Sequence, residues 1–255
     1  VLDMTDKYLI PGLIDTHVHH ATSPDSGDND QVTRMRLRKL LQGGVTSVRD
    51  MGGDTRALYS LKRRADNEDS PFDEIMLKAS GAGATGIKIY AKVSASVIPK
   101  LAAAAKKHGL KVWSHAFVGP ARPQQLVNAG VETISHAPDL SAHVVDNFYQ
   151  LRRENKHITE KQKAESFQLD SYQNLFDDMK KNQTILDATL TVFEKQKVAR
   201  GERGELMYQW GNTFTRMAHA NGIKISAGTD GTSDYYQSAY PLVQHEMQLL
   251  VNDVG

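Results

Sequence analysis

Short apolar runs rich in β-branched residues alternate along this chain with longer stretches in which apolar residues recur every three or four positions. The first pattern indicates buried strands and the second indicates amphipathic helices, so the alternation favours βα units and a parallel sheet. The predicted strands are residues 8–16, 45–49, 86–90, 110–115, 131–136, 183–190 and 222–228. The predicted helices are residues 29–42, 54–66, 73–80, 96–108, 120–129, 141–153 and 204–220. We therefore expect an α/β protein with a (β/α)8 TIM-like barrel, which commonly takes about 250 residues as one domain.

Two stretches depart from this rhythm. A complete barrel has eight strands, and the third strand is absent between the helices at 54–66 and 73–80. The connecting residues are too few and too polar for a strand with its loops, so we infer that residues are missing from this sequence near 70–74. The polar excursion at 154–169 is either a solvated helical segment or a lid over the mouth of the barrel. We treat residues 1–255 as one domain.

Composition narrows the choice of partners. The 31 Lys and Arg residues balance 30 Asp and Glu residues, which gives no electrostatic reason to expect nucleic acid or an anionic membrane surface. No apolar run approaches the ~20 residues of a membrane span, and no signal sequence precedes the first predicted strand. The absence of cysteine excludes disulfides, thiolate metal sites and a cysteine nucleophile. A small-molecule substrate is expected, while a homo-oligomer and a cytoplasmic or periplasmic location stay open.

Metal-ligand residue types follow several predicted strands. Side chains two apart in a strand share a face, so His17 and His19 make a natural half of a metal site. His115 and His136 each end a later strand, between a serine and an alanine, and Asp230 ends the last strand in the same way. The carboxyl ends of barrel strands carry the catalytic groups of this fold. Together these residues predict a metal-dependent site whose ions are held by nitrogen and oxygen, which suits Zn, Mn, Fe or Co.

One lysine extends this set. Lys88 lies in an apolar run between Ile87 and Ile89, where an ordinary ammonium would face a large desolvation cost. Reaction with carbon dioxide would turn its amine into a carbamate, whose two oxygens can bridge two metal ions. Four histidines, one such lysine and one aspartate then predict a two-metal hydrolytic site.

The order His-x-His, Lys, His, His, Asp resembles the amidohydrolase superfamily with a binuclear metal centre. Residues 11–19, Pro-Gly-Leu-Ile-Asp-Thr-His-Val-His, are similar to its opening signature. Residues 45–53, Val-Thr-Ser-Val-Arg-Asp-Met-Gly-Gly, resemble the branch of imidazolonepropionases and prolidase-like dipeptidases. The resemblance covers essentially the whole chain, although the small accessory β-sandwich of such proteins is missing from this sequence.

The resemblance implies a role for each ligand. His17, His19 and Asp230 would hold one ion, His115 and His136 the other, and carboxylated Lys88 and a hydroxide would bridge them. Two divalent ions, zinc first among them, would then activate the bridging hydroxide, and Asp230 would serve as general base and then general acid.

The surrounding residues allow two interpretations each. Asp15 shares the face of the first histidine pair, as a partner of the ligands or as a packed barrel residue. Tyr90, Arg49 and Asp50 are candidate substrate contacts, although a packed ring and an ion pair that fixes the turn at 52–53 explain them equally well. Four other histidines are expected not to bind metal: His20, His143, His219 and His245.

The function predicted from these residues is hydrolysis of a carbon–nitrogen amide bond, in a dipeptide-like (prolidase-like) or a cyclic amide substrate. An esterase, lactonase or phosphotriesterase would use the same ligands. A non-catalytic metal-binding barrel is the remaining alternative, and its sign would be a lost ligand.

Overall fold

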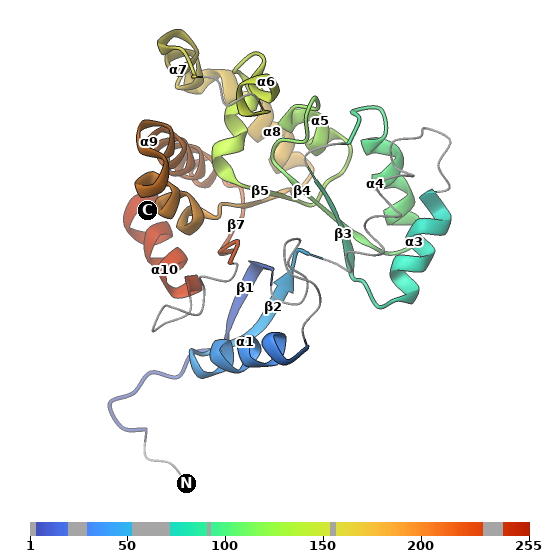
Figure 1. Ribbon diagram of the computed structural model, residues 1–255, viewed down its shortest axis with the longest axis vertical. Helices are drawn as coiled ribbons and strands as arrows, with labels where there is room; N and C mark the ends of the chain where they lie inside the picture. Colours follow the sequence, from blue (N-terminus) through green and yellow to red (C-terminus); the bar gives the residue numbers. More distant parts are fainter. Residues whose placement is uncertain (1–3, 20–29, 53–71, 91–92, 154–156, 232–241) are drawn as a thin grey trace.

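The computed structural model of the protein describes residues 4–19, 30–52, 72–90, 93–153, 157–231 and 242–255. Parallel strands lie at its centre and helices surround them (Figure 1). The strands are β1 (Leu13–Val18), β2 (Val45–Asp50), β3 (Gly86–Ile89), β4 (Lys111–His115), β5 (Thr133–Ser135), β6 (Ile185–Asp187) and β7 (Ile225–Ser226). All seven predicted strands are confirmed, mostly with tighter bounds.

The strands form two sheets that are joined through β1. One sheet pairs β1 with β2, and the other has the order β3-β4-β5-β6-β7. The Thr16 amide donates to the Ala227 carbonyl at 3.1 Å, and the His19 amide donates to the Gly231 carbonyl at 3.1 Å. These bonds place β1 beside the chain that follows β7, so the wall runs from β2 through β1 and β7 to β3.

The wall is open between β2 and β3, because no strand of the described residues pairs these two edges. A complete barrel would have its third strand at this place, and no strand was predicted for it. Residues 53–71 lie outside the described residues. Contacts of the β2 segment with the β3 segment and with β4 span this opening instead. The Tyr90 hydroxyl donates to the Met51 carbonyl at 2.9 Å, and the Arg49 guanidinium lies 5.0 Å from the centre of the Trp113 ring.

The α-helices are α1 (Asp30–Gln42), α3 (Phe72–Gly81), α4 (Ile98–Lys107), α5 (Pro123–Asn128), α6 (Phe148–Arg153), α7 (Glu160–Ser166), α8 (Gln173–Lys181), α9 (Leu190–Ala220) and α10 (Leu242–Leu249). Shorter turns are η1 (Ala137–His143), η2 (Leu169–Tyr172) and the π-helical η4 (Leu250–Val254). Helix α4 illustrates their origin: Pro99 opens it, its apolar face is buried, and Gly109 follows its end with φ +69°. Within the described residues, no helix is long and apolar enough to cross a membrane.

Two helix predictions and one strand prediction need correction or fall outside the described part. The predicted helix at 141–153 is wrong over its first part, because residues to His143 form the 3₁₀ turn η1 and the α-helix begins only at Phe148. The predicted strand at 183–190 ends at Asp187, and Leu190 already opens α9 because the Glu246 carboxylate accepts its backbone N–H at 2.9 Å. The predicted helix at 54–66 lies outside the described residues.

The structure describes parts of the two stretches that depart from the βα pattern. The predicted gap near 70–74 stays a prediction: residues 72–74 form the first turn of α3, and the residues before them lie outside the described part. The polar stretch at 154–169 contains α7 and the start of η2. Both sheets belong to the barrel wall, and the described residues form no separate β-sandwich.

Helix α9 is bent sharply at Gly201, whose φ of 53° and ψ of −135° are not helical. The chain turns back so closely that a Cβ on Gly204 would lie 2.2 Å from the Gln196 carbonyl oxygen. Lys197 and Glu205 form an ion pair of 3.2 Å across the bend. Two glycines therefore permit an elbow, which we define as residues 196–205, in the longest helical element.

Candidate metal centre

Three metal-ligand side chains meet where β1 and the chain after β7 run together. His17 and His19 leave β1 on its buried face, and their Nε2 atoms lie 3.3 and 3.0 Å from Oδ1 of Asp230. One ligand atom from each residue lies within 4.8 Å of the other two. The predicted shared face of the two histidines is confirmed, and Asp230 joins them.

The other two predicted histidines continue the same cluster. The ring centre of His136, just after β5, lies 5.2 Å from that of His17 and 4.5 Å from that of His115 at the end of β4. The Tyr90 ring follows at 4.9 Å from His115. The four imidazoles thus form a continuous row in the barrel mouth, and they come from strands β1, β4 and β5.

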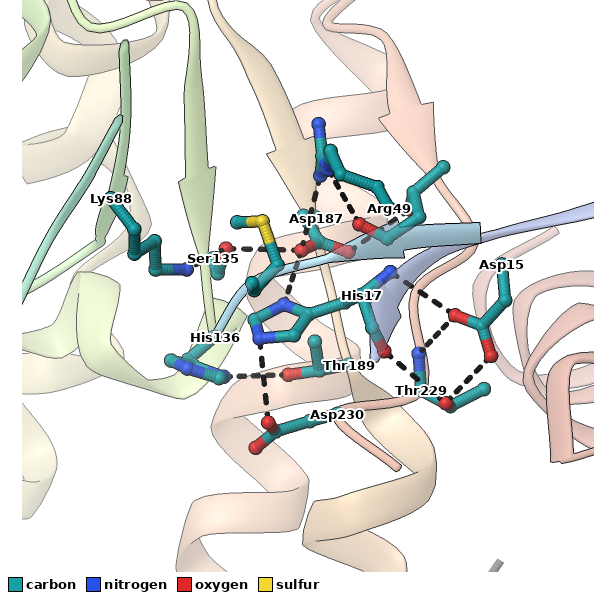
Figure 2. Close-up of polar contacts among 12 residues, drawn as sticks. Asp15, His17, Arg49, Lys88, Ser135, His136, Asp187, Thr189, Thr229 and Asp230 are labelled. Carbon is teal, nitrogen blue, oxygen red and sulfur yellow. Dashed lines mark hydrogen bonds and ion pairs between the residues drawn. The ribbon is translucent and has the colours of Figure 1, made fainter. Parts of the chain in front are cut away.

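Lys88 extends from β3 toward this row (Figure 2). Its Nζ donates a hydrogen bond of 2.8 Å to the Ser135 hydroxyl. Desolvation of the amine by burial lowers the pKa of Lys88 to about 7, although Asp187 and Asp230 act in the opposite direction. A substantial fraction of the amine is therefore neutral at physiological pH, and a neutral amine is the form that reacts as a nucleophile.

Asp187 is the central residue that the sequence analysis missed. It ends β6, is fully buried, and accepts hydrogen bonds from His17 Nδ1 at 2.7 Å and from the Ser135 hydroxyl at 3.0 Å. Burial acts to raise its pKa, but the charges of His17, Arg49 and Lys88 keep that pKa below its usual range. An ionised carboxylate only accepts hydrogen bonds, and desolvation by burial lowers the pKa of His17, so the neutral ring carries its proton on Nδ1 and presents the Nε2 lone pair to a metal.

Asp15 contacts the segments that carry two of the candidate ligands. Its carboxylate accepts bonds from the His17 backbone N–H at 3.1 Å and from the Thr229 hydroxyl at 2.8 Å (Figure 2). It therefore ties β1 to the residue just before Asp230. Asp15 positions two ligand-bearing segments relative to one another.

The three candidate substrate contacts are engaged in bonds within the protein. The Arg49 guanidinium donates to the Thr16 carbonyl at 2.6 Å and lies 3.6 Å from the Asp187 carboxylate. The Asp50 carboxylate accepts the Gly52 N–H at 2.9 Å, which fixes the following turn. The Tyr90 hydroxyl donates to Met51, as described above. These contacts account for all three residues without a substrate.

Three residues at the site have a strained backbone. His136, Thr189 and Asp230 have φ values of 75°, 53° and 52°, which cost about 1–3 kcal/mol each for residues other than glycine. Thr189 Oγ1 lies 2.9 Å from His136 Nδ1 and holds that ring in place. The fold maintains these conformations where they aim the side chains of His136 and Asp230 at the cluster.

The donor set fits a divalent metal. The His17 Nε2 atom is buried and has no hydrogen-bond partner in the described structure, and a ligand atom in that state is suited to a metal. Imidazole nitrogens with a carboxylate oxygen suit zinc and neighbouring transition metals. Among the histidines expected not to bind metal, His143 packs on the Tyr172 ring and His245 is bonded to Glu194. His219 lies near the end of α9, and His20 is outside the described residues.

A cavity of about 350 Å³ opens beside these ligands. Its walls include three residues of the cluster and the first part of α9. The lining residues are His115, His136, Phe148, Leu151, Ile158, Val192, Phe193, Gln196, Arg200, Arg203, Met207 and Asp230.

Solved structures share this architecture. A Xaa-Pro dipeptidase with bound methionine in the active site is 16% identical with a TM-score of 0.59, over 95% of this chain and 70% of that one. Ochratoxinase from A. niger is 16% identical with a TM-score of 0.63, over 96% of this chain and 67% of that one. A bottromycin amidohydrolase is 16% identical with a TM-score of 0.56, over 95% and 63%. At these identities the similarity establishes the fold, an α/β barrel, and the chain spans about two thirds of each protein.

Among curated protein sequences, none matches the chain. The model of the amidohydrolase family, in contrast, matches residues 8–249, which is nearly the whole chain. The chain therefore belongs to the amidohydrolase family.

Proposed function

We propose that this chain is a metal-dependent hydrolase that cleaves an amide bond in a dipeptide-like substrate. The observation that carries the proposal is that ligand-type side chains from five separate parts of the barrel lie in one connected cluster. His17, His19 and Asp230 form one group, the rings of His136 and His115 continue it, and Lys88 is linked to it through Ser135 and Asp187. Two divalent ions, zinc or otherwise Mn, Fe or Co, would be held by His17, His19, Lys88, His115, His136 and Asp230. Membership of the amidohydrolase family supports a hydrolase acting on amide bonds.

Lys88 would enter this site as a carbamate. Its neutral amine would attack carbon dioxide, form an N–C bond and lose a proton, which leaves an anion with two oxygens. The lowered pKa of Lys88 and its direction toward Ser135 and the histidines support this step.

Bound ions would supply Lewis-acid polarisation of the scissile carbonyl and would acidify a water molecule. The protein would supply the proton transfers. Burial acts to raise the pKa of Asp230, but its hydrogen bond with His19 and the nearby charges of His17 and Lys88 lower it, so the carboxylate is ionised at neutral pH. Asp230 would take a proton from the attacking water and pass it to the leaving nitrogen. Asp187 would keep His17 in the tautomer that presents Nε2.

The choice of a dipeptide-like substrate over a cyclic amide is supported by a structural neighbour that is described as a Xaa-Pro dipeptidase. The resemblance of residues 45–53 fits both substrate classes, because that branch contains imidazolonepropionases as well as prolidase-like dipeptidases. The cavity of about 350 Å³ lies at the small end of the range of ligand pockets, which suits a compact substrate.

The test is a substrate panel on the full chain purified from cells grown with bicarbonate and supplemental zinc or manganese. Xaa-Pro and other dipeptides, N-acyl amino acids, a hydantoin, a lactone and a phosphotriester would be compared. We expect metal-dependent amide hydrolysis that falls at least about 100-fold in Asp230→Asn. Asp170→Asn, which changes an exposed carboxylate, is the matched control. Hydrolysis of esters or phosphotriesters alone would contradict the proposal, as would metal binding without turnover of any substrate.

A further inference from the structure

The start of helix α9 is not capped by the residue that precedes it. Thr189 occupies this position, where a threonine side chain usually accepts a hydrogen bond from an N–H group of the first turn. Among the described residues, the Thr189 side chain accepts no such bond, and its backbone is left-handed, with φ 53° and ψ 43°. Its hydroxyl lies instead 2.9 Å from Nδ1 of His136 (Figure 2). The hydroxyl that could cap the helix therefore holds a candidate metal ligand.

Glu246 of α10 supplies the cap. Its carboxylate accepts the Leu190 N–H at 2.9 Å, the Thr191 N–H at 2.7 Å and the Thr191 hydroxyl at 2.6 Å. The two N–H groups belong to the first turn of α9, where N–H groups have no partner within the helix. Glu246 is fully buried and lies 55 positions from Thr191 along the chain. A distant residue thus does what Thr189 would otherwise do locally.

The charge of Glu246 does not by itself stabilise the fold. Burial raises the pKa of Glu246 to about 7, although its bonds with Thr191 and Leu190 act to lower it. A raised pKa means that the ionised carboxylate is less favourable in the folded protein than in water. Thr189 could cap α9 without this cost in the extended conformation that is usual before a helix. The buried carboxylate is therefore best explained by what it permits, which is the contact of Thr189 with His136.

The backbone around Thr189 is restrained on both sides. The His136 N–H donates to the Asp187 carbonyl at 2.9 Å, which fixes the chain before Thr189, and Glu246 fixes the chain after it. A β-branched residue rarely has a left-handed backbone, so this conformation needs support from its neighbours. Loss of the Glu246 carboxylate would remove the support on one side. It would also leave two N–H groups of α9 in need of an acceptor.

We propose that Glu246 caps α9 in place of Thr189 and thereby positions His136 for a metal ion. This inference rests on the proposed function and adds to it a positioning residue that touches neither substrate nor metal. Without Glu246, the Thr189 hydroxyl would leave the left-handed conformation and cap α9 itself. The helix would persist, but the His136 ring would lose its partner. The ion at the group that contains His17 would be little affected.

The test compares Glu246→Met, which removes both acceptor oxygens, with Val243→Ala. Val243 is also buried in α10, but it packs in a separate cluster with Leu40 and Val45, so its truncation controls for a general loss of stability. Zinc is titrated into the full chain in competition with a chromogenic chelator, and circular dichroism verifies the fold. The wild type and Val243→Ala should bind two ions alike. Glu246→Met should keep one ion and bind the second about 10- to 100-fold more weakly.

A double-variant cycle separates positioning through Thr189 from a general structural role. Thr189→Val removes the hydroxyl at similar volume, so it should also weaken the second ion. The double variant should bind this ion no more weakly than the weaker single variant, because both changes remove the same contact. Additive losses, wild-type affinity in Glu246→Met, or an equal loss in Val243→Ala would overturn the inference. If Glu246→Met does not fold, Glu246→Gln, which places an NH2 group against one of the N–H donors, replaces it with the same expectation.

The position of His136 also has a readout that needs no metal. In the metal-free chain with isotope-labelled histidine, the Nδ1 resonance of His136 reports its hydrogen bond, and His136→Gln assigns that resonance. We expect it to shift in Glu246→Met and Thr189→Val alike, at a fixed pH, and to stay in place in Val243→Ala. An unchanged resonance in Glu246→Met would overturn the inference. The expected shift in a chain that binds no zinc would support the positioning of His136 and count against the proposed function alone.

Discussion

Replacing Lys88 with methionine should stabilise the metal-free protein near neutral pH. Methionine fills similar volume without an amine, so it removes the cost of desolvating a charge. A pKa that falls from 10.5 in the unfolded chain to about 7 in the fold corresponds to about 5 kcal/mol. The hydrogen bond to Ser135 is lost, at about 1 kcal/mol, and part of the lysine surface stays accessible. We therefore expect a net gain of about 2–3 kcal/mol below pH 7.

The gain should depend on pH in a defined direction. Between pH 7 and 10.5 the unfolded wild type binds more protons at this lysine than the folded protein, so wild-type stability rises with pH across this window. The advantage of Lys88→Met should be complete below pH 7 and should disappear toward pH 10. Urea unfolding of chelator-treated, bicarbonate-free protein at several pH values measures it, with the exposed Lys106→Met as control. A variant that is less stable than wild type by the same amount at every pH would refute the reasoning.

Three further predictions concern the surroundings of His17. Asp187→Asn removes the acceptor that fixes the His17 tautomer, so the affinity for zinc should fall about 10- to 100-fold. A competition titration with a chromogenic chelator measures this affinity, and an unchanged value would exclude the role of Asp187. Gly228→Ala should destabilise the fold by about 1–3 kcal/mol and weaken zinc binding, because a Cβ there would lie 2.2 Å from the Asp187 carboxylate. Denaturation and zinc titrations measure both effects. Gly81→Ala is the control, because a Cβ at Gly81 meets no atom within 4 Å and should change neither stability nor zinc affinity. Asp230→Asn should keep most of the metal by elemental analysis yet lose turnover, and an unchanged kcat would remove Asp230 from proton transfer.

Residues that lie in regular strands could be predicted from the sequence. The apolar runs before His17, His115 and His136 determine which face is buried, and the barrel gathers the strand ends, so local patterns were sufficient to bring these rings together. Lys88 stood out because it lies in an otherwise apolar strand of a predicted barrel, where an ordinary ammonium would face a large desolvation cost.

Residues defined by contacts between distant segments could not be predicted. Asp187 ends an apolar strand and could equally have been a solvated terminal residue, and its partner His17 lies 170 positions away. Its only signal was a lone acid at the same strand end as the ligands. The start of α9 was also predicted wrongly, because the strand expected at 183–190 was continued to Leu190. A carboxylate from α10 accepts the backbone N–H groups of Leu190 and Thr191 and starts a helix there.

The most direct test of the account is the metal content of the purified chain, measured by elemental analysis after growth with bicarbonate and zinc or manganese. The account predicts two ions per chain in the wild type and a sharp fall in Lys88→Ala. One ion per chain that is unaffected by Lys88→Ala would contradict the bridged binuclear site and return Lys88 to a structural role.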